Sequence, residues 1–173
     1  MIIVLIGYMA SGKSTIGRVL AEKLNYSFID LDDFIEEKEN ATISDIFKTK
    51  GEIYFRKKET HYLNDLLNTK SRLVLSLGGG TPCYSNNMET ILKANNTVSI
   101  YLKALIPTLI SRLKTEKGKR PLIAHIETDD LLTEFIGKHL FERSPFYSQA
   151  ETIVTTDNKA ENEIIEELVL KLF

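Results

Sequence analysis

The chain has 173 residues, of which 43% are hydrophobic and 27% are charged, and its formal net charge is −2. This size and composition are typical of a single globular domain, which we expect to span residues 1–173 and to bury a sizeable core. The small net charge argues against a nucleic-acid or membrane partner, and the single cysteine, Cys83, excludes an internal disulfide and favours a cytoplasmic location.

Strand and helix signals alternate along the chain, beginning with the apolar run of residues 1–6. Such a run indicates a strand buried on both faces of a parallel sheet. The alternation predicts an α/β fold of five strands and about eight helices, with helices on both faces of the sheet. Further strands are expected at 26–31, 73–77, 97–102 and 152–155, and helices at 15–24, 34–39, 52–67, 86–93, 107–113 and 160–173, with two more that begin at Thr42 or Ser44 and at Thr128 and end at Gly51 and Pro145.

Residues 7–15 match the phosphate-binding loop pattern G-x-x-x-x-G-K-S. Glycines let backbone N–H groups approach phosphate oxygens, and the helix that follows presents its N-terminus to the anion. Lys13 is expected to reach the β- and γ-phosphates of ATP, and the Ser14 hydroxyl to bind Mg²⁺. The alternative is a chance Lys-Ser pair in an ordinary turn, but the flanking strand and helix favour a nucleotide site, formed by Ala10, Ser11, Gly12, Lys13, Ser14 and Thr15.

Two acids, Asp30 and Asp32, lie at the end of the second predicted strand. Alternation along a strand would place both carboxylates on one face, at the edge of the sheet where ligands bind. One of them is then suited to hold Mg²⁺ through water, and the other to accept a proton from an attacking hydroxyl. The alternative is that these acids only cap the next helix, a position where Asp is favoured.

Two further features suggest binding of an acceptor. Arg56 and Glu59 are three residues apart on a predicted helix, and a guanidinium held by a carboxylate can bind a substrate carboxylate bidentately. An ordinary surface ion pair is the commoner case. The glycines at 78–80 directly follow a strand and suggest a ligand lying against bare backbone, with a loose turn as the alternative.

The segment 114–121 is polar and basic, which predicts a mobile loop. Arg120 in this loop can swing over ATP and stabilise the charge of the transferring phosphoryl group. Arg143 is suited to a second anionic group, and Arg112 is a further arginine near a loop, although each of the three alone is more often a surface charge. The histidines have no metal-ligand spacing.

In combination, these motifs give the chain a resemblance to the shikimate kinase family over essentially its full length. The resemblance implies ATP-dependent phosphorylation of the 3-hydroxyl of shikimate, in aromatic amino acid biosynthesis. It also implies a three-layer P-loop fold like that of nucleoside monophosphate kinases, with a five-stranded parallel sheet in the order 2-3-1-4-5. The segments that carry the resemblance are GYMASGKST (7–15), FIDLD (28–32), GEIYFR (51–56), LSLGGG (75–80), RPL (120–122) and RSPFY (143–147).

The resemblance implies further that the substrate-binding segment spans about 32–60, that a mobile lid spans about 114–127 and that the protein is a monomer. The expected catalytic residues are Asp32, the candidate base, together with Lys13 and Arg120, the lid arginine on ATP. The other implied roles are Mg²⁺ at Ser14 and Asp30, the adenine side of ATP at Arg112, the shikimate carboxylate at Arg56 and Arg143, the shikimate ring at Gly78, Gly79 and Gly80, and orientation of Arg56 by Glu59.

Two other interpretations remain open. Another small-molecule kinase of the same fold, such as a gluconate kinase, would share the phosphate-binding loop but should lack the combination of Arg56, three glycines and Arg143. A non-catalytic nucleotide-binding switch would bind ATP without turnover, and the presence of Asp32 and Arg120 argues against it.

Overall fold

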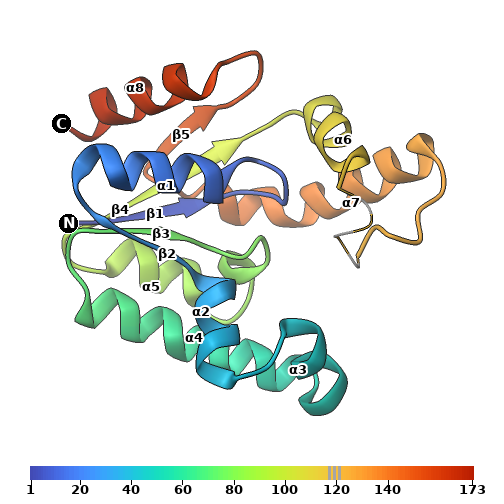
Figure 1. Cartoon of the computed structure of the whole chain (residues 1–173), viewed down its shortest axis with the longest axis horizontal. Coiled ribbons are helices and arrows are strands. Elements are labelled where there is room, and N and C mark those ends of the chain that lie inside the picture. Colours follow the sequence, from blue (N-terminus) through green and yellow to red (C-terminus); the bar gives the residue numbers. More distant parts are fainter. Residues whose placement is uncertain (117, 119, 121) are drawn as a thin grey trace.

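The computed structural model describes residues 1–116, 118, 120 and 122–173, and a five-stranded parallel sheet forms its centre (Figure 1). The strand order is β2-β3-β1-β4-β5, and every pairing is parallel. The predicted α/β fold and its strand order are therefore confirmed. The strands are β1 (Ile2–Ile6), β2 (Ser27–Asp30), β3 (Leu73–Ser76), β4 (Thr97–Lys103) and β5 (Thr152–Thr155).

Helices flank the sheet on both faces, as Figure 1 shows, and α2 and α3 lie below the sheet in that view. None of the described helices is long and apolar enough to cross a membrane. The helices of the described chain are α1 (Lys13–Leu24), α2 (Leu31–Glu39), α3 (Ile43–Lys50), α4 (Glu52–Thr69), α5 (Asn87–Lys93), α6 (Ile106–Lys114), α7 (Asp129–Tyr147) and α8 (Glu161–Leu172), with a short 3-10 helix, η1 (Thr81–Cys83).

β1 occupies the centre of the sheet because its side chains are apolar on both faces. Ile3 and Leu5 belong to a buried cluster that includes residues of α1 and α8. Val4 and Ile6 belong to a second, larger cluster with residues of α2, α4, α5, α6 and α7. The period-2 alternation of a strand therefore gives one apolar segment two cores, and the sheet becomes the middle of three layers.

The parallel pairing brings the segments that follow the strands to one edge of the sheet. Leu5 of β1 and Asp30 of β2 are both paired with Ser76 of β3. Three segments far apart in the sequence therefore start from neighbouring points: the phosphate-binding loop, the beginning of α2 and the glycines at 78–80. Ligands of open α/β sheets bind at this edge.

The predicted end of one helix is wrong. Pro145 was expected to terminate the helix that begins after Thr128, but α7 continues to Tyr147 with Pro145 inside its last turn. A proline there removes only one backbone hydrogen bond, the one to the carbonyl of residue 141, and few residues follow. Phe141 is 84% exposed, so this position faces solvent. The two extra residues place Tyr147, which is fully buried, in the core.

The segment predicted as a lid, 114–127, includes Lys117, Lys119 and Pro121, which lie outside the described residues. Within its described part, Ile123 is fully buried in the larger core cluster. The carbonyl of Arg120 accepts hydrogen bonds from the backbone N–H groups of Ile123 and Ala124. The segment thus has an apolar anchor on the C-terminal side of Arg120. Its mobility stays a prediction.

Candidate active site

The phosphate-binding loop has two positions, Gly7 and Gly12, where the backbone favours glycine. A Cβ at Gly7 would lie 2.6 Å from Ser11 Oγ and 2.7 Å from the carbonyl oxygen of Leu102, far inside normal contact. Gly12 adopts a φ of 95° just before α1 and leaves the N-terminus of that helix without a side-chain cap. The first N–H groups of α1 therefore remain available to an anion, and their positive dipole end favours phosphate.

Lys13 is the buried cation of this loop. Its ammonium donates hydrogen bonds to the carbonyls of Gly7, at 2.8 Å, and Tyr8, at 3.0 Å. Burial lowers the pKa of Lys13 to about 8, and the nearby carboxylates of Asp32 and Asp30 oppose that change. With a pKa of about 8 the ammonium is still mostly charged at neutral pH. It therefore places a positive charge in the loop where an anion would bind.

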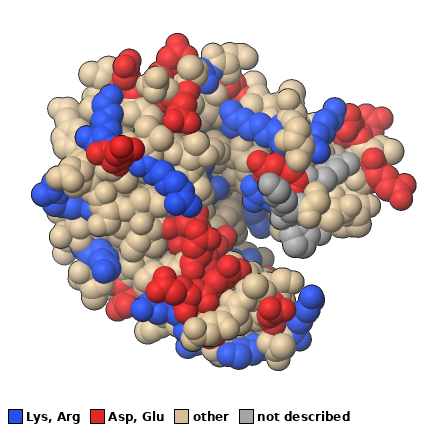
Figure 2. Space-filling model, viewed as in Figure 1, with Lys and Arg blue, Asp and Glu red and all other residues tan. Residues whose placement is uncertain are grey.

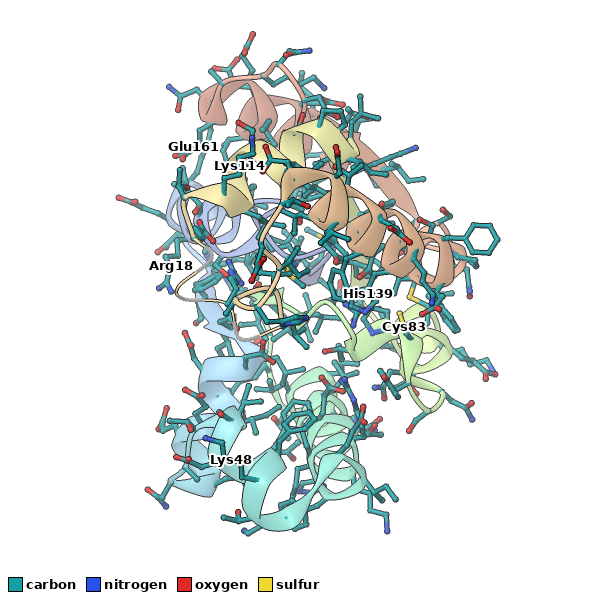
Figure 3. The ribbon with its side chains drawn as sticks, turned by 90° about the vertical axis from the view of Figure 1, so that its right-hand side faces the viewer. Arg18, Lys48, Cys83, Lys114, His139 and Glu161 are labelled. Atoms are coloured by element: carbon teal, nitrogen blue, oxygen red, sulfur yellow. The ribbon has the colours of Figure 1, made fainter. Side chains whose placement is uncertain are left out.

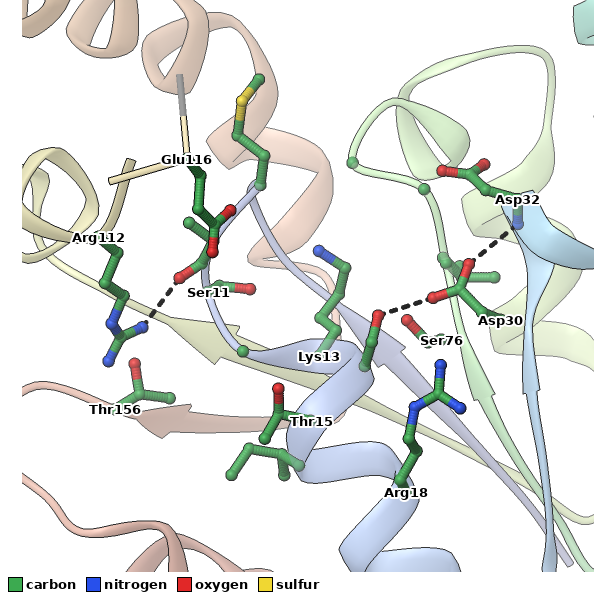
Figure 4. A pocket seen from close by; sticks show the side chains of 18 of the residues that line it. Ser11, Lys13, Thr15, Arg18, Asp30, Asp32, Ser76, Arg112, Glu116 and Thr156 are labelled. Carbon is green, nitrogen blue, oxygen red and sulfur yellow. Dashed lines mark hydrogen bonds between the residues drawn. The ribbon is translucent and has the colours of Figure 1, made fainter. Parts of the chain in front are cut away.

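Asp30 connects the loop to α2. Its carboxylate accepts a hydrogen bond from the Ser14 hydroxyl, at 2.7 Å, and another from the backbone N–H of Asp32, at 3.1 Å (Figure 4). The sequence argument placed Asp32 on the strand, which is wrong: β2 ends at Asp30, and Asp32 lies in the first turn of α2. Asp30 does cap α2, yet both acids also line the cavity described below. The capping and ligand-binding interpretations therefore coexist.

The pKa of Asp32 departs strongly from the ordinary value of an aspartate. Burial, reinforced by the carboxylates of Asp30 and Glu59, raises its pKa to about 7, and Lys13 and Arg56 oppose this shift. A carboxyl group with a pKa near 7 can exist in both protonation states at physiological pH. It is thus able to accept a proton and to release it again.

A cavity of about 610 Å³ opens at this edge of the sheet. Figure 2 shows a hollow in this face of the molecule, with acidic side chains gathered along the wall near α2. Twelve predicted site residues line the cavity: Ala10, Ser11, Gly12, Lys13, Ser14, Thr15, Asp30, Asp32, Gly78, Gly79, Arg112 and Arg120. Gly80, Arg56 and Arg143, also predicted, do not line it.

Two arginines, one just before the predicted lid and one within it, contribute to the cavity that contains the loop. Arg112 Nη1 donates a hydrogen bond of 2.9 Å to the carbonyl of Ala10. Arg120 donates from Nε and Nη2 to the Glu116 carboxylate, at 3.1 Å and 2.8 Å, and both of these side chains are partly exposed. Both arginines line the same cavity as Lys13. The Glu116 carboxylate uses two of the five N–H donors of the Arg120 guanidinium, which leaves the others for a ligand in the cavity.

Arg56 and Arg143 lie beyond the cavity, around the glycine run. Gly78 faces Asp32, since a Cβ there would lie 2.8 Å from Asp32 Oδ1. A Cβ at Gly79 would lie 3.0 Å from Arg143 Nη1, and one at Gly80 would lie 3.0 Å from Arg56 Nη2. Each glycine thus faces a different predicted side chain, and an added methyl group at any of them would crowd it.

A buried carboxylate joins Arg56 to the residue after the glycines. Glu59, 1% exposed, accepts hydrogen bonds from Arg56 Nη1, at 2.9 Å, and from the Thr81 hydroxyl, at 2.7 Å. The Asn87 side-chain amide in turn donates to the carbonyl of Thr81. This network ties α4 to the end of the glycine run. Thr81 and Asn87 were not predicted, because nothing in their spacing indicates the contact.

The opposite side of the run rests on α7. The Tyr147 hydroxyl donates to the carbonyl of Gly79, and the Tyr8 hydroxyl lies 3.0 Å from His139 Nδ1. Figure 3 labels His139 on α7 and Cys83 at the end of η1, and α7 packs against η1. Burial raises the pKa of the Cys83 thiol to about 11, which disfavours the reactive thiolate form. Sequence reasoning missed Tyr8, His139 and Tyr147, since each contact depends on how α7 packs.

The donor set at the loop fits a magnesium ion that is shared with a bound phosphate. The described residues contain no group of three or more His, Cys, Asp or Glu side chains able to form a metal cage. Mg²⁺ is typically held by one or two protein oxygens together with phosphates and water. The Ser14 hydroxyl and the Asp30 carboxylate meet that description, and the buried Ser76 hydroxyl beside them has no protein partner.

A parallel sheet in this order, a phosphate-binding loop and an adjacent carboxyl group near neutrality define a P-loop phosphotransferase for small molecules. The comparisons identify the family. A family model described as shikimate kinase matches residues 9–173. A shikimate kinase of Flavobacterium psychrophilum is 46% identical over 171 residues, covering 99% of this chain and 98% of that one. The chain belongs to the shikimate kinase family and is an ATP-dependent kinase.

Solved structures agree with this assignment. The shikimate kinase of Bacteroides thetaiotaomicron superimposes with a TM-score of 0.91 at 35% identity, covering 99% of this chain and 98% of that one. A shikimate kinase of Acinetobacter baumannii, solved in complex with shikimate, has a TM-score of 0.86 at 32% identity and covers 99% of this chain and 92% of that one.

Proposed function

We propose that this kinase transfers the γ-phosphoryl group of ATP to the 3-hydroxyl of shikimate, giving shikimate 3-phosphate and ADP. The observation that carries the proposal is the glycine run at 78–80. Its three members face, in order, a proton acceptor and two arginines: Asp32, Arg143 and Arg56. A small hydroxylated carboxylate such as shikimate offers groups that match all three, a hydroxyl for the acid and a carboxylate for the guanidinium pair.

Asp32 acts on the acceptor in this proposal. Its carboxylate, with a pKa of about 7, accepts the proton of the reacting hydroxyl as the new O–P bond forms. Lys13 and Arg120, which line the same cavity, stabilise the negative charge on the transferring group and on the leaving ADP.

Ser14 and Asp30 would hold Mg²⁺, which supplies neutralisation of phosphate charge when bound. Arg112, which is fixed on the Ala10 carbonyl, is placed to border the nucleotide, and Thr156 and Lys159 lie on the same cavity. The described segment around Arg120 acts as the lid that excludes water from the transferring group. In this proposal one domain contains both sites and acts as a monomer.

The test is a coupled assay of ADP release with shikimate and, in parallel, with gluconate. The proposal expects turnover that depends on shikimate and on Mg²⁺, with a large preference over gluconate. A preference for gluconate would show that the protein phosphorylates a different class of acceptor. Tight ATP binding with no turnover for either compound would instead support the nucleotide-binding switch.

A further inference from the structure

Arg56 is enclosed on several sides by its own element. Its Nη1 donates to the buried Glu59, and its Nε lies 3.6 Å from a Glu52 oxygen. That Nε is buried without a hydrogen-bond partner, and the whole side chain is only 17% exposed. A single hydrogen bond to Glu59 leaves the guanidinium free to rotate about that bond, so a further contact is needed to fix its plane.

Tyr84 supplies that support from outside α4. The central carbon of the Arg56 guanidinium lies 3.7 Å from the centre of the Tyr84 ring. The other arginine–aromatic contacts of the described chain range from 4.8 Å to 5.9 Å. A separation of 3.7 Å is that of a guanidinium stacked face-on over a ring, a geometry that fixes the plane as well as the position of the group.

Tyr84 is itself held by the network that holds Arg56. It directly follows η1, whose first residue, Thr81, donates to Glu59 and accepts from Asn87. The carbonyl of Tyr84 accepts a hydrogen bond from the backbone N–H of Asn87. The ring and the guanidinium are therefore placed from one set of bonds. Gly80 also lies beside Arg56 and leaves no room for a side chain, since a Cβ would lie 3.0 Å from Nη2.

We propose that Tyr84 is a positioning residue for acceptor binding: its ring holds the Arg56 guanidinium in the plane in which it receives the carboxylate of the acceptor. This inference rests on the proposed function, because it takes Arg56 as a carboxylate-binding residue. The contribution comes from the ring face and not from the hydroxyl. The hydroxyl is expected to be dispensable, and any side chain without a ring to lose affinity for the acceptor.

The experiment compares Tyr84→Phe, which keeps the ring, with Tyr84→Leu, which keeps an apolar side chain without a π face. Tyr84→Leu is expected to raise the KM for shikimate about 3- to 30-fold, the range for loss of a partly buried cation–π contact, with the KM for ATP within about 2-fold. Tyr84→Phe is expected to match the wild type. Circular dichroism melting of each variant establishes that it is folded.

A double-mutant cycle separates positioning from a general structural role. Arg56→Ala by itself should raise the KM for shikimate and leave that for ATP unchanged. In the Arg56→Ala background, Tyr84→Leu should have no further effect on the KM for shikimate, because no guanidinium remains to be positioned. An unchanged KM for Tyr84→Leu, a loss in Tyr84→Phe as large as in Tyr84→Leu, or full additivity in the cycle would overturn the inference.

The wild-type control keeps this test distinct from that of the proposed function. A wild-type protein that does not phosphorylate shikimate refutes the function itself. A wild type that is active with shikimate, and that tolerates Tyr84→Leu, refutes only the role of the ring. A Tyr84→Leu protein that fails to fold is replaced by Tyr84→Met, which also lacks a ring, and the same expectations apply.

Discussion

The groups around Asp32 shift its pKa in opposite directions. Burial and the neighbouring carboxylates of Asp30 and Glu59 raise its pKa to about 7, while Lys13 favours the ionised form. The protein thus holds an acid where its charged form is unfavourable. Proton acceptance needs such a group, because a carboxylate with an ordinary pKa is a weaker base.

The activity of the protein should follow the ionisation of Asp32. Asp32→Asn is expected to lower kcat about 10²- to 10⁴-fold, because the amide cannot accept the proton, while ATP binding is retained. In the wild type, kcat/KM should rise with pH up to about 7 and fall again where Lys13, whose pKa is lowered to about 8, loses its charge. Steady-state kinetics from pH 5 to 10 measure both limbs, and near-normal turnover by Asp32→Asn would remove this residue from the mechanism.

The same substitution should stabilise the protein at alkaline pH. The pKa of Asp32 in the folded state, about 7, lies above its ordinary value of 3.8. The stability gained from the neutral carboxyl is therefore complete below pH 3.8 and is lost as the pH rises through 7. Asn stays neutral at both pH values. The Tm of Asp32→Asn minus the Tm of the wild type should therefore be larger at pH 8 than at pH 5, by at least about 2 °C. Thermal denaturation followed by circular dichroism checks this, and equal differences at both pH values would contradict it.

At the scale of elements, Glu39 joins the helix of Asp32 to the helix of Arg56. Glu39 ends α2, and its carboxylate accepts hydrogen bonds from the hydroxyls of Tyr54, at 2.6 Å, and Tyr62, at 2.7 Å, both on α4. Lys58, also on α4, lies 3.3 Å away. The hydrogen bonds from Tyr54 and Tyr62, together with Lys58, lower the pKa of Glu39 to about 2. The distance between the two site-bearing helices is thus set at the far end of α2.

Removing one hydroxyl from this carboxylate should loosen the helix pair. Tyr62→Phe is expected to cost about 1.5–3 kcal/mol, the usual value of a hydrogen bond to a charged group. Glu39 stabilises the fold above its ordinary pKa of 4.5 and loses this effect as the pH falls toward 2, so the difference should shrink at pH 3. Urea denaturation at pH 7 and pH 3 measures it.

Tyr26→Phe serves as the matched control for that measurement. The Tyr26 ring faces Arg72, at 5.6 Å, and its hydroxyl forms no hydrogen bond among the described residues. This control should change the free energy of unfolding by less than about 0.5 kcal/mol. A Tyr62→Phe protein as stable as the Tyr26→Phe protein would show that the Glu39 contacts do not hold the two helices together.

At the scale of the whole molecule, local patterns predicted the elements and the nucleotide loop, and failed where packing decides. The apolar run of β1 and the loop at 7–15 are continuous in sequence, so their structure follows from local rules. Asp32 was placed on a strand because period-2 counting cannot detect that Asp30 caps a helix. Tyr84 and Glu39 carry no motif, and their partners lie 28 and 15 or 23 residues away, on elements that meet only after folding.

The assembled site should stabilise the whole fold when it binds a nucleotide. ADP with Mg²⁺ at about 100 times its Kd should add about 2.7 kcal/mol, which corresponds to a rise in Tm of roughly 5–10 °C for a chain of this size. Chelation of Mg²⁺ should reduce the rise, since the ion would link the bound phosphates to the oxygens of Ser14 and Asp30. Differential scanning fluorimetry measures the shift, and an unchanged rise after chelation would argue against a metal at this position.

The hydrogen bonds of Lys13 have one more consequence. Its ammonium is tied to two carbonyls of the very loop that is shaped to receive phosphate. The ammonium therefore holds the loop in shape before a ligand arrives. An incoming triphosphate can take the place of these carbonyls as its partner without a change in the fold of the loop. Adenosine, which has no phosphate, offers the ammonium nothing in exchange. The loop therefore selects its ligand by the charge of the phosphates rather than by the identity of the base.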